Sequence, residues 1–442
     1  MNILMMTNTY LPQVGGVARS VASFTDEFRR RGHRVLVVAP TYTHMPDTEV
    51  DVVRVPAIPN FNGSEFSLKL PVPLALSTLL HGFVPDVIHS HHPFLLGDTA
   101  LRVSAILKRP LLFTHHTMYE QYTHYVPAAN EVVRSFAVHL PTGYANLCDH
   151  VVAPSESIAA VLRERGVETP LAVIPTGIDP HLFSRGDGPA VWRRHGIPRE
   201  AFVVGHVGRL AHEKNLLFLA RAVARFVASD ERAHFLVVGG GPVEDDIRAV
   251  FADAGAADRL HLTGPLSGQD LADAYHAMDV FAFASKSETQ GMVLAEAMTA
   301  SLPVVALDAP GARDVLVDGE AGRLLDHEDE TAFVEALQEL ADSPRRRARM
   351  ARTARATAEE YSLERCATRM LDLYAGLIDT PERTPAEGSA WDRVTRAIEA
   401  EWHLWTTRVG AAYKAIADGV NAGHERADTD SADRSTEVTA TP

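Results

Sequence analysis

The stretch NILMMTNTYLPQVGGVARSVASFTDEFRRRGHRVLVVA, residues 2–39, holds one strand–loop–helix–strand unit. An apolar run at Asn2–Met6 leads into a loop, after which apolar residues recur at helical spacing, at Val17, Val21, Phe24 and Phe28. Residues 34–39 (RVLVVA) are apolar almost throughout, which indicates a strand buried on both faces, as in a parallel sheet. The stretch therefore predicts the first β-α-β unit of a doubly wound α/β fold.

The same alternation continues along the chain and then restarts. Further strands are expected in the first half at residues 86–89, 111–114, 151–153 and 172–174. A turn at 175–180 and a polar connection at 184–198 follow, and the second half offers a strand at 201–206, a helix at 215–227 and strands at 234–238, 260–263, 280–283 and 303–306. We expect two Rossmann-like parallel-sheet domains at 1–180 and 199–360, a helix at 361–378, a helical extension at 379–420 that carries Trp402 and Trp405, and a disordered polar tail at 421–442.

Charge and composition exclude several classes of protein. The chain has 42 basic and 57 acidic residues, a net charge of −15, which argues against non-specific binding of nucleic acid. Cys148 and Cys366 are its two cysteines and fit neither a metal nor a disulfide pattern, so we expect a reducing, cytoplasmic compartment. The N-terminus lacks the pattern of a signal peptide, and no apolar run approaches the roughly 20 residues of a membrane span. Any contact with a membrane is expected to be peripheral.

Gly15 and Gly16 open the first helix directly after the first strand and its loop. Backbone amides at a helix N-terminus bind anions, and glycine lets a phosphate approach the backbone. An ordinary strand-to-helix turn is the alternative. The G-x-G-x-x-G fingerprint is missing, which lowers the case for a nicotinamide enzyme.

Histidines gather at two predicted strand ends. The run FTHHTMY (113–119) lies at the carboxyl end of a strand, the edge that faces the ligand in open α/β sheets. A histidine there is suited to donate a hydrogen bond to a sugar hydroxyl, and a buried structural role is equally expected from this run alone. His89, His91 and His92 follow another strand, but their spacing matches no zinc motif, and we expect no metal site.

The segment GRLAHEKN (208–215) follows a strand and precedes a helix in the second half. Arg209 and Lys214 lie five residues apart across this turn, so both cations can converge on one phosphate group. Fixed cations stabilise the charge that develops on a diphosphate leaving group without requiring a metal. A solvated basic pair is the alternative.

The segment SETQGMVLAE (287–296) holds two glutamates, Glu288 and Glu296, with seven residues between them. Glu288 is expected in a loop, where it can hydrogen-bond sugar hydroxyls, and Gly291 lets a helix N-terminus approach a ligand. Glu296 is expected two turns along that helix, where it can reach a ribose diol. The alternative is a helix-start acid favoured by the macrodipole together with a surface glutamate.

Taken together, these four segments resemble glycosyltransferase family 4, over roughly residues 1–378. The resemblance implies the GT-B fold, in which an acceptor-binding and a nucleotide-sugar-binding domain face a central cleft and the helix at 361–378 crosses back to the first domain. It also implies a retaining enzyme that needs no metal and no cofactor. The only evident D-x-D pattern, Asp428-Thr429-Asp430, falls in the polar tail.

The resemblance assigns roles to individual residues. His116 matches the histidine that contacts the transferred sugar, Glu288 the acid that contacts the same sugar, and Glu296 the acid that binds ribose. Arg209 and Lys214 match the pair that grips the diphosphate, and Gly15 and Gly16 match the glycine loop near the donor phosphates and the acceptor. Backbone contacts to the phosphates and the sugar of the donor are assigned to Gln290, Gly291, Met292 and Val293. The nucleotide base is expected near residues 262–266, with Leu266 as a contact residue.

Two further sequence runs indicate the class of acceptor. HSHHPFLLG (89–97) and THHTMYEQYTHYV (114–126) resemble the bacterial diacylglycerol glucosyltransferases. That resemblance implies UDP-glucose as donor, a lipid acceptor at the membrane surface and an α-glucosyl product. Glucosyl or mannosyl transfer to phosphatidylinositol or to a soluble acceptor, a sugar-nucleotide epimerase or hydrolase of the same fold, and a non-catalytic sugar-binding protein are the alternatives. A second, nucleophilic carboxylate is not evident, so we expect transfer on the face from which the leaving group departs.

Overall fold

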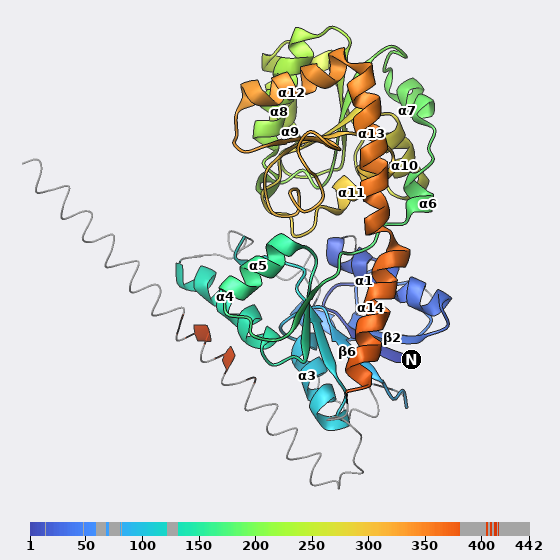
Figure 1. The fold of residues 1–442 in the computed structure, drawn as a ribbon, viewed down its shortest axis with the longest axis vertical. Helices are drawn as coiled ribbons and strands as arrows, with labels where there is room; N and C mark the ends of the chain where they lie inside the picture. The colour runs from blue at the N-terminus through green and yellow to red at the C-terminus, as the bar shows by residue number, and fades with distance from the viewer. Residues whose placement is uncertain are drawn as a thin grey trace, which may run out of the picture. The chain divides into compact units, whose positions relative to one another are not determined.

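The structure is a computed structural model that describes residues 1–13, 15–46, 48–58, 68–69, 80, 82–121 and 131–380, with positions 404, 407, 408, 411, 412 and 414. The chain forms two compact units (Figure 1). Unit 1 comprises Met1–Ala153, Ala159–Ala172 and Asp372–Pro442, and unit 2 comprises Pro154–Ile158 and Val173–Leu371. The extension expected at 379–420 and the tail expected at 421–442 fall almost entirely outside the described residues, as do Trp402 and Trp405.

Unit 1 is built on a seven-stranded sheet in the order β3-β2-β1-β6-β7-β8-β9. Its strands are β1 (Asn2–Met6), β2 (Arg34–Pro40), β3 (Val52–Val55), β6 (Val87–Ser90), β7 (Leu111–Thr114), β8 (His150–Ala153) and β9 (Leu171–Val173). The helices that follow them are α1 (Gly16–Arg30), α3 (Leu96–Leu107), α4 (Glu131–Ala145) and α5 (Glu156–Glu164), and a short hairpin pairs β4 (Ala57–Ile58) with β5 (Leu68–Lys69). β1 pairs in parallel with both β2 and β6, as the buried apolar runs predict.

Unit 2 repeats the plan with six strands in the order β12-β11-β10-β13-β14-β15. The strands are β10 (Phe202–Val207), β11 (Ala233–Val238), β12 (Leu260–Leu262), β13 (Val280–Phe283), β14 (Val304–Leu307) and β15 (Gly322–Leu325), all paired in parallel. Its helices are α6 (Pro180–Phe183), α7 (Gly188–His195), α8 (Leu216–Ser229), α9 (Glu244–Asp253), α10 (Gly268–His276), α11 (Met292–Thr299), α12 (Glu330–Asp342) and α13 (Pro344–Ala358). Three short 3-10 turns are η3 (His212–Lys214), η4 (Ala257–Arg259) and η5 (Glu359–Tyr361).

Helices cover both faces of the unit 2 sheet. One apolar core joins the sheet to α8, α9 and α12, and the other joins it to α6, α7, α10, α11 and α13. Figure 1 shows α8, α9 and α12 on one side of this sheet and α7, α10 and α13 on the other. The expected doubly wound architecture is therefore confirmed in unit 2, and unit 1 has the expected parallel sheet with helices between its strands.

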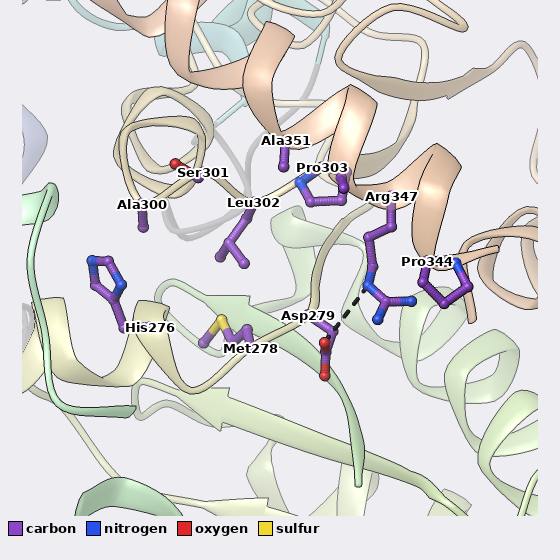
Figure 2. Close-up of a pocket in the computed structure, with 11 residues that line it drawn as sticks. His276, Met278, Asp279, Ala300, Ser301, Leu302, Pro303, Pro344, Arg347 and Ala351 are labelled. Carbon is purple, nitrogen blue, oxygen red and sulfur yellow. Dashed lines mark ion pairs between the residues drawn. The ribbon is translucent and has the colours of Figure 1, made fainter. Parts of the chain in front are cut away.

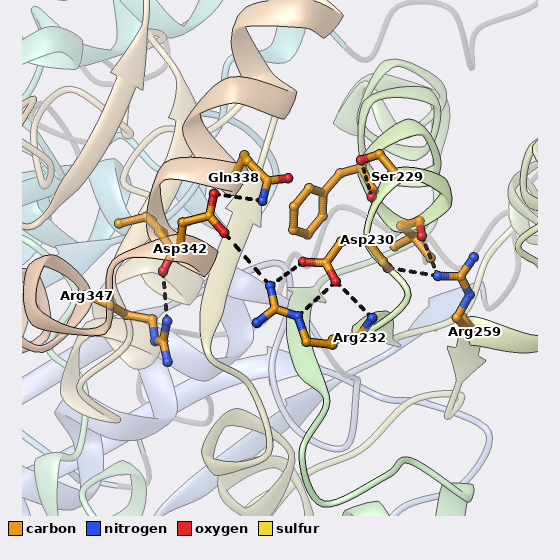
Figure 3. A network of polar contacts seen from close by, with 10 residues as sticks. Ser229, Asp230, Arg232, Arg259, Gln338, Asp342 and Arg347 are labelled. Atoms are coloured by element: carbon orange, nitrogen blue, oxygen red, sulfur yellow. Dashed lines mark hydrogen bonds and ion pairs between the residues drawn. The ribbon is translucent and has the colours of Figure 1, made fainter.

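A polar network closes the amino edge of the unit 2 sheet (Figure 3). Arg232 at the start of β11 makes a 2.7 Å ion pair with Asp230 and lies 3.9 Å from Asp342 at the end of α12. Arg259 donates to the carbonyl oxygen of Asp230 at 2.9 Å. These contacts tie the ends of helices to the sheet at the edge opposite the one where ligands bind in such folds.

Two features differ from the sequence-based expectation. The segment 184–198, expected to be a polar connection, contains α7, because Asp187 caps its N-terminus through a 3.0 Å bond from the Ala190 amide and Gly196 ends it at φ 68°. Strands β3 and β15, which were not expected, extend the two sheets at one edge each.

Helix α14 (Leu363–Ile378) begins in unit 2 and ends in unit 1. Tyr374 on this helix is fully buried in unit 1, where its hydroxyl lies 2.6 Å from Nδ1 of His89. Among the helices in the described part of the chain, none has both the length and the apolar character that crossing a membrane would require.

Candidate active site

The ligand edge of unit 2 is marked by a topological switch point. β10 and β13 are neighbours in the sheet, but α8, which follows β10, packs on one face, and α11, which follows β13, packs on the other. Loops at the carboxyl ends of two such strands separate and leave a crevice between them. The loop after β10 carries Arg209 and Lys214, and the loop after β13 carries Glu288, so the fold places these three residues at one edge of the sheet.

Lys214 and Glu288 meet at this crevice, although 74 residues separate them in the chain. The Nζ atom of Lys214 donates to Oε1 of Glu288 at 2.5 Å. Their side chains are 16% and 21% exposed, so the pair is partly withdrawn from water but still reachable by a ligand. A cation suited to a phosphate and a carboxylate suited to sugar hydroxyls are thus held side by side.

Arg209 is paired with a different carboxylate, that of Glu213. The Arg209 side chain is half exposed, whereas that of Glu213 is buried. Arg209 was expected to converge with Lys214 on one phosphate. In the structure each of these cations holds a carboxylate of its own, and the common phosphate stays a prediction.

The backbone after Glu288 has the shape of an anion site. Gly291 is the N-cap of α11 with φ 71°, and a Cβ there would lie 2.9 Å from the carbonyl oxygen of Gly311, so only glycine fits. Met292 and Val293 form the first turn of α11, whose amides have no partner within the helix. The buried side chain of Gln290 exchanges two 2.6 Å hydrogen bonds with the backbone of Thr176, which fixes this loop within unit 2.

Glu296 lies one turn further along α11 and is fully buried. Its Oε2 atom accepts a 2.8 Å hydrogen bond from the hydroxyl of Tyr275 on α10. The carboxylate has no solvent exposure in this structure, so the expected contact with ribose requires a movement of the Glu296 side chain or of the residues that bury it. Leu266, expected near the base, is half buried between β12 and α10 and packs on the core of this face.

In unit 1, Gly15 and Gly16 start α1 at the carboxyl end of β1. A Cβ on either residue would meet nothing within 4 Å, and Gly15 has φ 180°, an extended conformation open to any residue. Neither packing nor backbone strain therefore requires glycine here. The expected approach of a ligand to this backbone stays a prediction.

His116 follows β7 at the same edge of the unit 1 sheet and keeps part of its surface exposed. Its Nε2 atom lies 3.0 Å from Nδ1 of His91, which follows β6 and is buried. Burial lowers the pKa of His116 to about 4, so the ring is neutral near pH 7 and can act as a hydrogen-bond donor without carrying charge. In the part of the chain that the structure describes, no group of three or more His, Cys, Asp or Glu side chains is arranged to hold a metal ion.

A hollow elsewhere in unit 2 is not the site (Figure 2). It lies at the amino ends of β13 and β14, where Met278, Leu302 and Pro303 line it together with Asp279 and Arg347. The Arg347 guanidinium donates to the Leu340 carbonyl at 2.8 Å and lies 3.7 Å from Asp279. These polar groups already have partners within the protein, so nothing in the hollow calls for a ligand.

Sequence reasoning missed three residues that shape the site. Glu213 forms an ion pair with Arg209, and the hydroxyl of Tyr275 donates a hydrogen bond to Glu296. The buried ring of His206 lies close enough to Lys214 and Glu288 for both charges to affect its pKa. Glu213 stands within the quoted segment 208–215 and was open to prediction as an i, i+4 partner of Arg209. Tyr275 and His206 carried no signal in the sequence, because only the fold brings them to the site.

Comparison with known proteins agrees with this geometry. Residues 14–182 match Glycosyltransferase Family 4, and residues 191–357 match Glycosyl transferases group 1. A GDP-mannose-dependent alpha-mannosyltransferase from Mycolicibacterium smegmatis is 33% identical over 343 residues, 74% of this chain and 84% of that protein. The chain belongs to glycosyltransferase family 4.

Two further proteins show what this family 4 protein is similar to. An alpha-monoglucosyldiacylglycerol synthase from Streptococcus pneumoniae is 28% identical over 348 residues, 76% of this chain and 78% of that synthase. Among solved structures, Anabaena Alr3699/HepE in complex with UDP and glucose has a TM-score of 0.65 at 21% identity and covers 84% of this chain and 99% of its own. That last similarity establishes the GT-B fold, and the family match makes the protein a glycosyltransferase.

Proposed function

We propose that this family 4 protein transfers glucose from UDP-glucose to a hydroxyl of diacylglycerol, with retention of configuration and without a metal ion or cofactor. The observation that carries the proposal is the 2.5 Å pair of Lys214 and Glu288 at the switch point of unit 2. A group for the diphosphate and a group for the sugar are adjacent there, as a nucleotide-sugar donor requires. In this proposal His116, Arg209, Lys214 and Glu288 touch the donor.

Binding and leaving-group stabilisation come from fixed charge. When the bond between the sugar carbon C1 and the phosphate oxygen breaks, negative charge grows on the diphosphate. Arg209, Lys214 and the first-turn amides of α11 lie at the edge of the unit 2 sheet where this proposal puts the diphosphate, and together they can do the work that a divalent cation does elsewhere. Removing one such donor typically costs about 3–4 kcal/mol of transition-state stabilisation.

The proposed stereochemistry rests on the hydrogen bond that Glu288 accepts from Lys214. The ammonium of Lys214 donates to Oε1 of Glu288, and this charge-assisted hydrogen bond stabilises the carboxylate and makes it a weaker nucleophile toward C1. We therefore assign Glu288 to sugar binding and propose same-face transfer. The acceptor oxygen bonds to C1 on the face that the phosphate leaves, and the acceptor proton passes to a phosphate oxygen of the departing UDP.

The acceptor assignment is supported by relatives. Two alpha-monoglucosyldiacylglycerol synthases resemble this chain, and the one from Acholeplasma laidlawii is 26% identical over 392 residues, 98% of its length. With such an acceptor the protein works as a peripheral enzyme at the cytoplasmic face of a membrane.

Mannosyl transfer is the second candidate, and the mannosyltransferase relative at 33% identity favours it. The two donors differ in both base and sugar, so one assay separates them. The protein is incubated with UDP-glucose or GDP-mannose and with mixed micelles containing diacylglycerol or phosphatidylinositol, and lipid products are read by mass. A hexosyl diacylglycerol made only from UDP-glucose is expected.

Other results of this assay would redirect the assignment. Mannolipid made only from GDP-mannose would replace glucose with mannose. UDP release that needs a soluble acceptor would remove the lipid. Turnover of UDP-glucose to another nucleotide sugar without any acceptor would identify an epimerase.

A further inference from the structure

Five histidines stand at the carboxyl ends of β6 and β7, and two of them, His91 and His115, have buried ring nitrogens without a hydrogen-bond partner among the described residues. Of these two, His91 is the one whose ring contacts His116 through a hydrogen bond. His89 is satisfied on both nitrogens, by the Tyr374 hydroxyl at 2.6 Å and by the Thr114 hydroxyl at 2.7 Å. His92 accepts the Asn8 amide on Nδ1 at 3.0 Å. His91 lies between these two in the chain, and its Nδ1 contacts Nε2 of His116 at 3.0 Å.

His91 is not explained by packing. It is 1% exposed, and its Nε2 atom has no hydrogen-bond partner among the described residues. A buried polar atom left in this state costs about 1–3 kcal/mol, which an aliphatic side chain in the same place would avoid. A cost of this kind is typically kept where the group serves a function.

The geometry points to His91 as a positioning residue that fixes the tautomer of His116, an inference that rests on the proposed role of His116 in sugar binding. Two neutral rings share one proton in the 3.0 Å contact. If His116 donated it, Nε2 of His91 would carry a buried N–H with no acceptor, which is the rarer kind of defect. His91 therefore donates from Nδ1, Nε2 of His116 accepts, and the proton of His116 resides on Nδ1.

The burial of the two rings agrees with His91 as the donor and His116 as the acceptor of this hydrogen bond. His116 keeps part of its surface exposed, whereas His91 lies beneath it and its ring is 4.1 Å from that of His89. Burial holds the pKa of both His91 and His116 below the usual range, so both rings stay neutral and only one proton lies between them. The tautomer of a histidine is set by the hydrogen bond made at its other nitrogen, and an unconstrained ring prefers the Nε2–H form. His91 thus imposes on His116 the form that presents an N–H from Nδ1.

Two amide substitutions of different length provide the test. In H91N the side-chain amide takes the place of Nδ1 and can still donate to His116, while in H91Q the amide reaches the region of Nε2 and cannot. We expect kcat for glucose transfer from UDP-glucose to diacylglycerol in mixed micelles to fall about 10- to 100-fold in H91Q, the penalty for a misplaced group, and to stay within about fivefold of wild type in H91N. H234N is the matched control, because His234 makes a 2.9 Å bond to His261 in unit 2, and it should leave kcat unchanged.

A spectroscopic measurement distinguishes a positioning role of His91 from a purely structural one. Nitrogen-15 NMR of histidine-labelled protein, with His116 assigned by its loss in H116Q, should show the proton on Nδ1 in wild type and H91N and on Nε2 in H91Q. An Nε2–H form in wild type, or equal kcat in H91N and H91Q, would overturn the inference. A wild-type protein that transfers no sugar from any donor refutes the proposed function instead, and the tautomer of His116 still tests the histidine pair.

Discussion

Replacing Lys214 with Met is the sharpest perturbation of the donor site. Methionine keeps the length and apolar stem of lysine but removes the charge that the proposed function places against the departing diphosphate. The ammonium is also the partner of Glu288, at 2.5 Å, so the change affects the groups assigned to both halves of the donor.

The size of the effect follows from the exposure of the pair. The side chains of Lys214 and Glu288 are 16% and 21% exposed, so water screens them only partly. At an effective dielectric constant of about 20, two unit charges 4 Å apart interact by about 4 kcal/mol. Loss of most of this from the transition state predicts a fall in kcat/KM of about 100- to 1000-fold. The free energy of unfolding should drop by only about 1 kcal/mol, because Glu288 can turn toward solvent.

The assay measures initial rates of UDP release against UDP-glucose concentration, with thermal unfolding of each variant as the check on folding. K286M is the control, since Lys286 makes a 2.5 Å pair with Glu328 in the same loop region but both side chains are far more exposed, at 59% and 39%. K286M should stay within about twofold of wild type. If K214M kept kcat/KM within threefold of wild type while folded, the reasoning about the diphosphate would be refuted.

Three further predictions concern other parts of the protein. Tyr275→Phe removes a hydrogen bond from the fully buried carboxylate of Glu296, so calorimetry should show a loss of about 1–3 kcal/mol in the free energy of unfolding, and an unchanged melting temperature would contradict it. Gly15→Ala adds a methyl group that meets no protein atom within 4 Å, so we expect unfolding within about 1 kcal/mol of wild type but weaker binding of UDP-glucose by titration calorimetry; equal affinity would remove the glycine from the donor site. Burial lowers the pKa of His206 to about 4, whereas in the unfolded chain it titrates near 6.5, so the unfolded state takes up the proton first as pH falls. The free energy of unfolding should therefore decrease from pH 7 to pH 5, more steeply in wild type than in H206Q, and equal slopes would count against it.

The sequence predicted the two sheets because their central strands are continuous apolar runs. β1 and β2 are buried along nearly their whole length, and such runs are readable without tertiary information. β3 and β15 were missed because they are only partly buried: β3 has a single buried residue, and β15 is the short run GRLL. Helix α7 was missed although Asp187 and Gly196 are standard capping residues, since the stretch between them has a weak apolar pattern.

At the site, local motifs indicated which residues matter but not how they pair. Lys214 was expected to act with Arg209, yet the fold brings it to Glu288 across 74 residues of chain. Gln290 was expected to offer its backbone to the donor, which stays a prediction, whereas the fixing of the loop to Thr176 by its side chain was not expected. Contacts of this kind depend on how two loops of one sheet edge pack, and no periodicity or spacing within a single segment encodes them.

The central claim, transfer of glucose to a lipid with retention, is tested most directly by the anomeric configuration of the product. UDP-glucose, whose sugar is α-linked, is incubated with the protein and diacylglycerol micelles, and the purified glycolipid is examined by proton NMR. The account predicts a single α-glucosyl diacylglycerol, with the small coupling constant of an α-anomeric proton. A β-linked product, or UDP release with no sugar on the lipid, would contradict it.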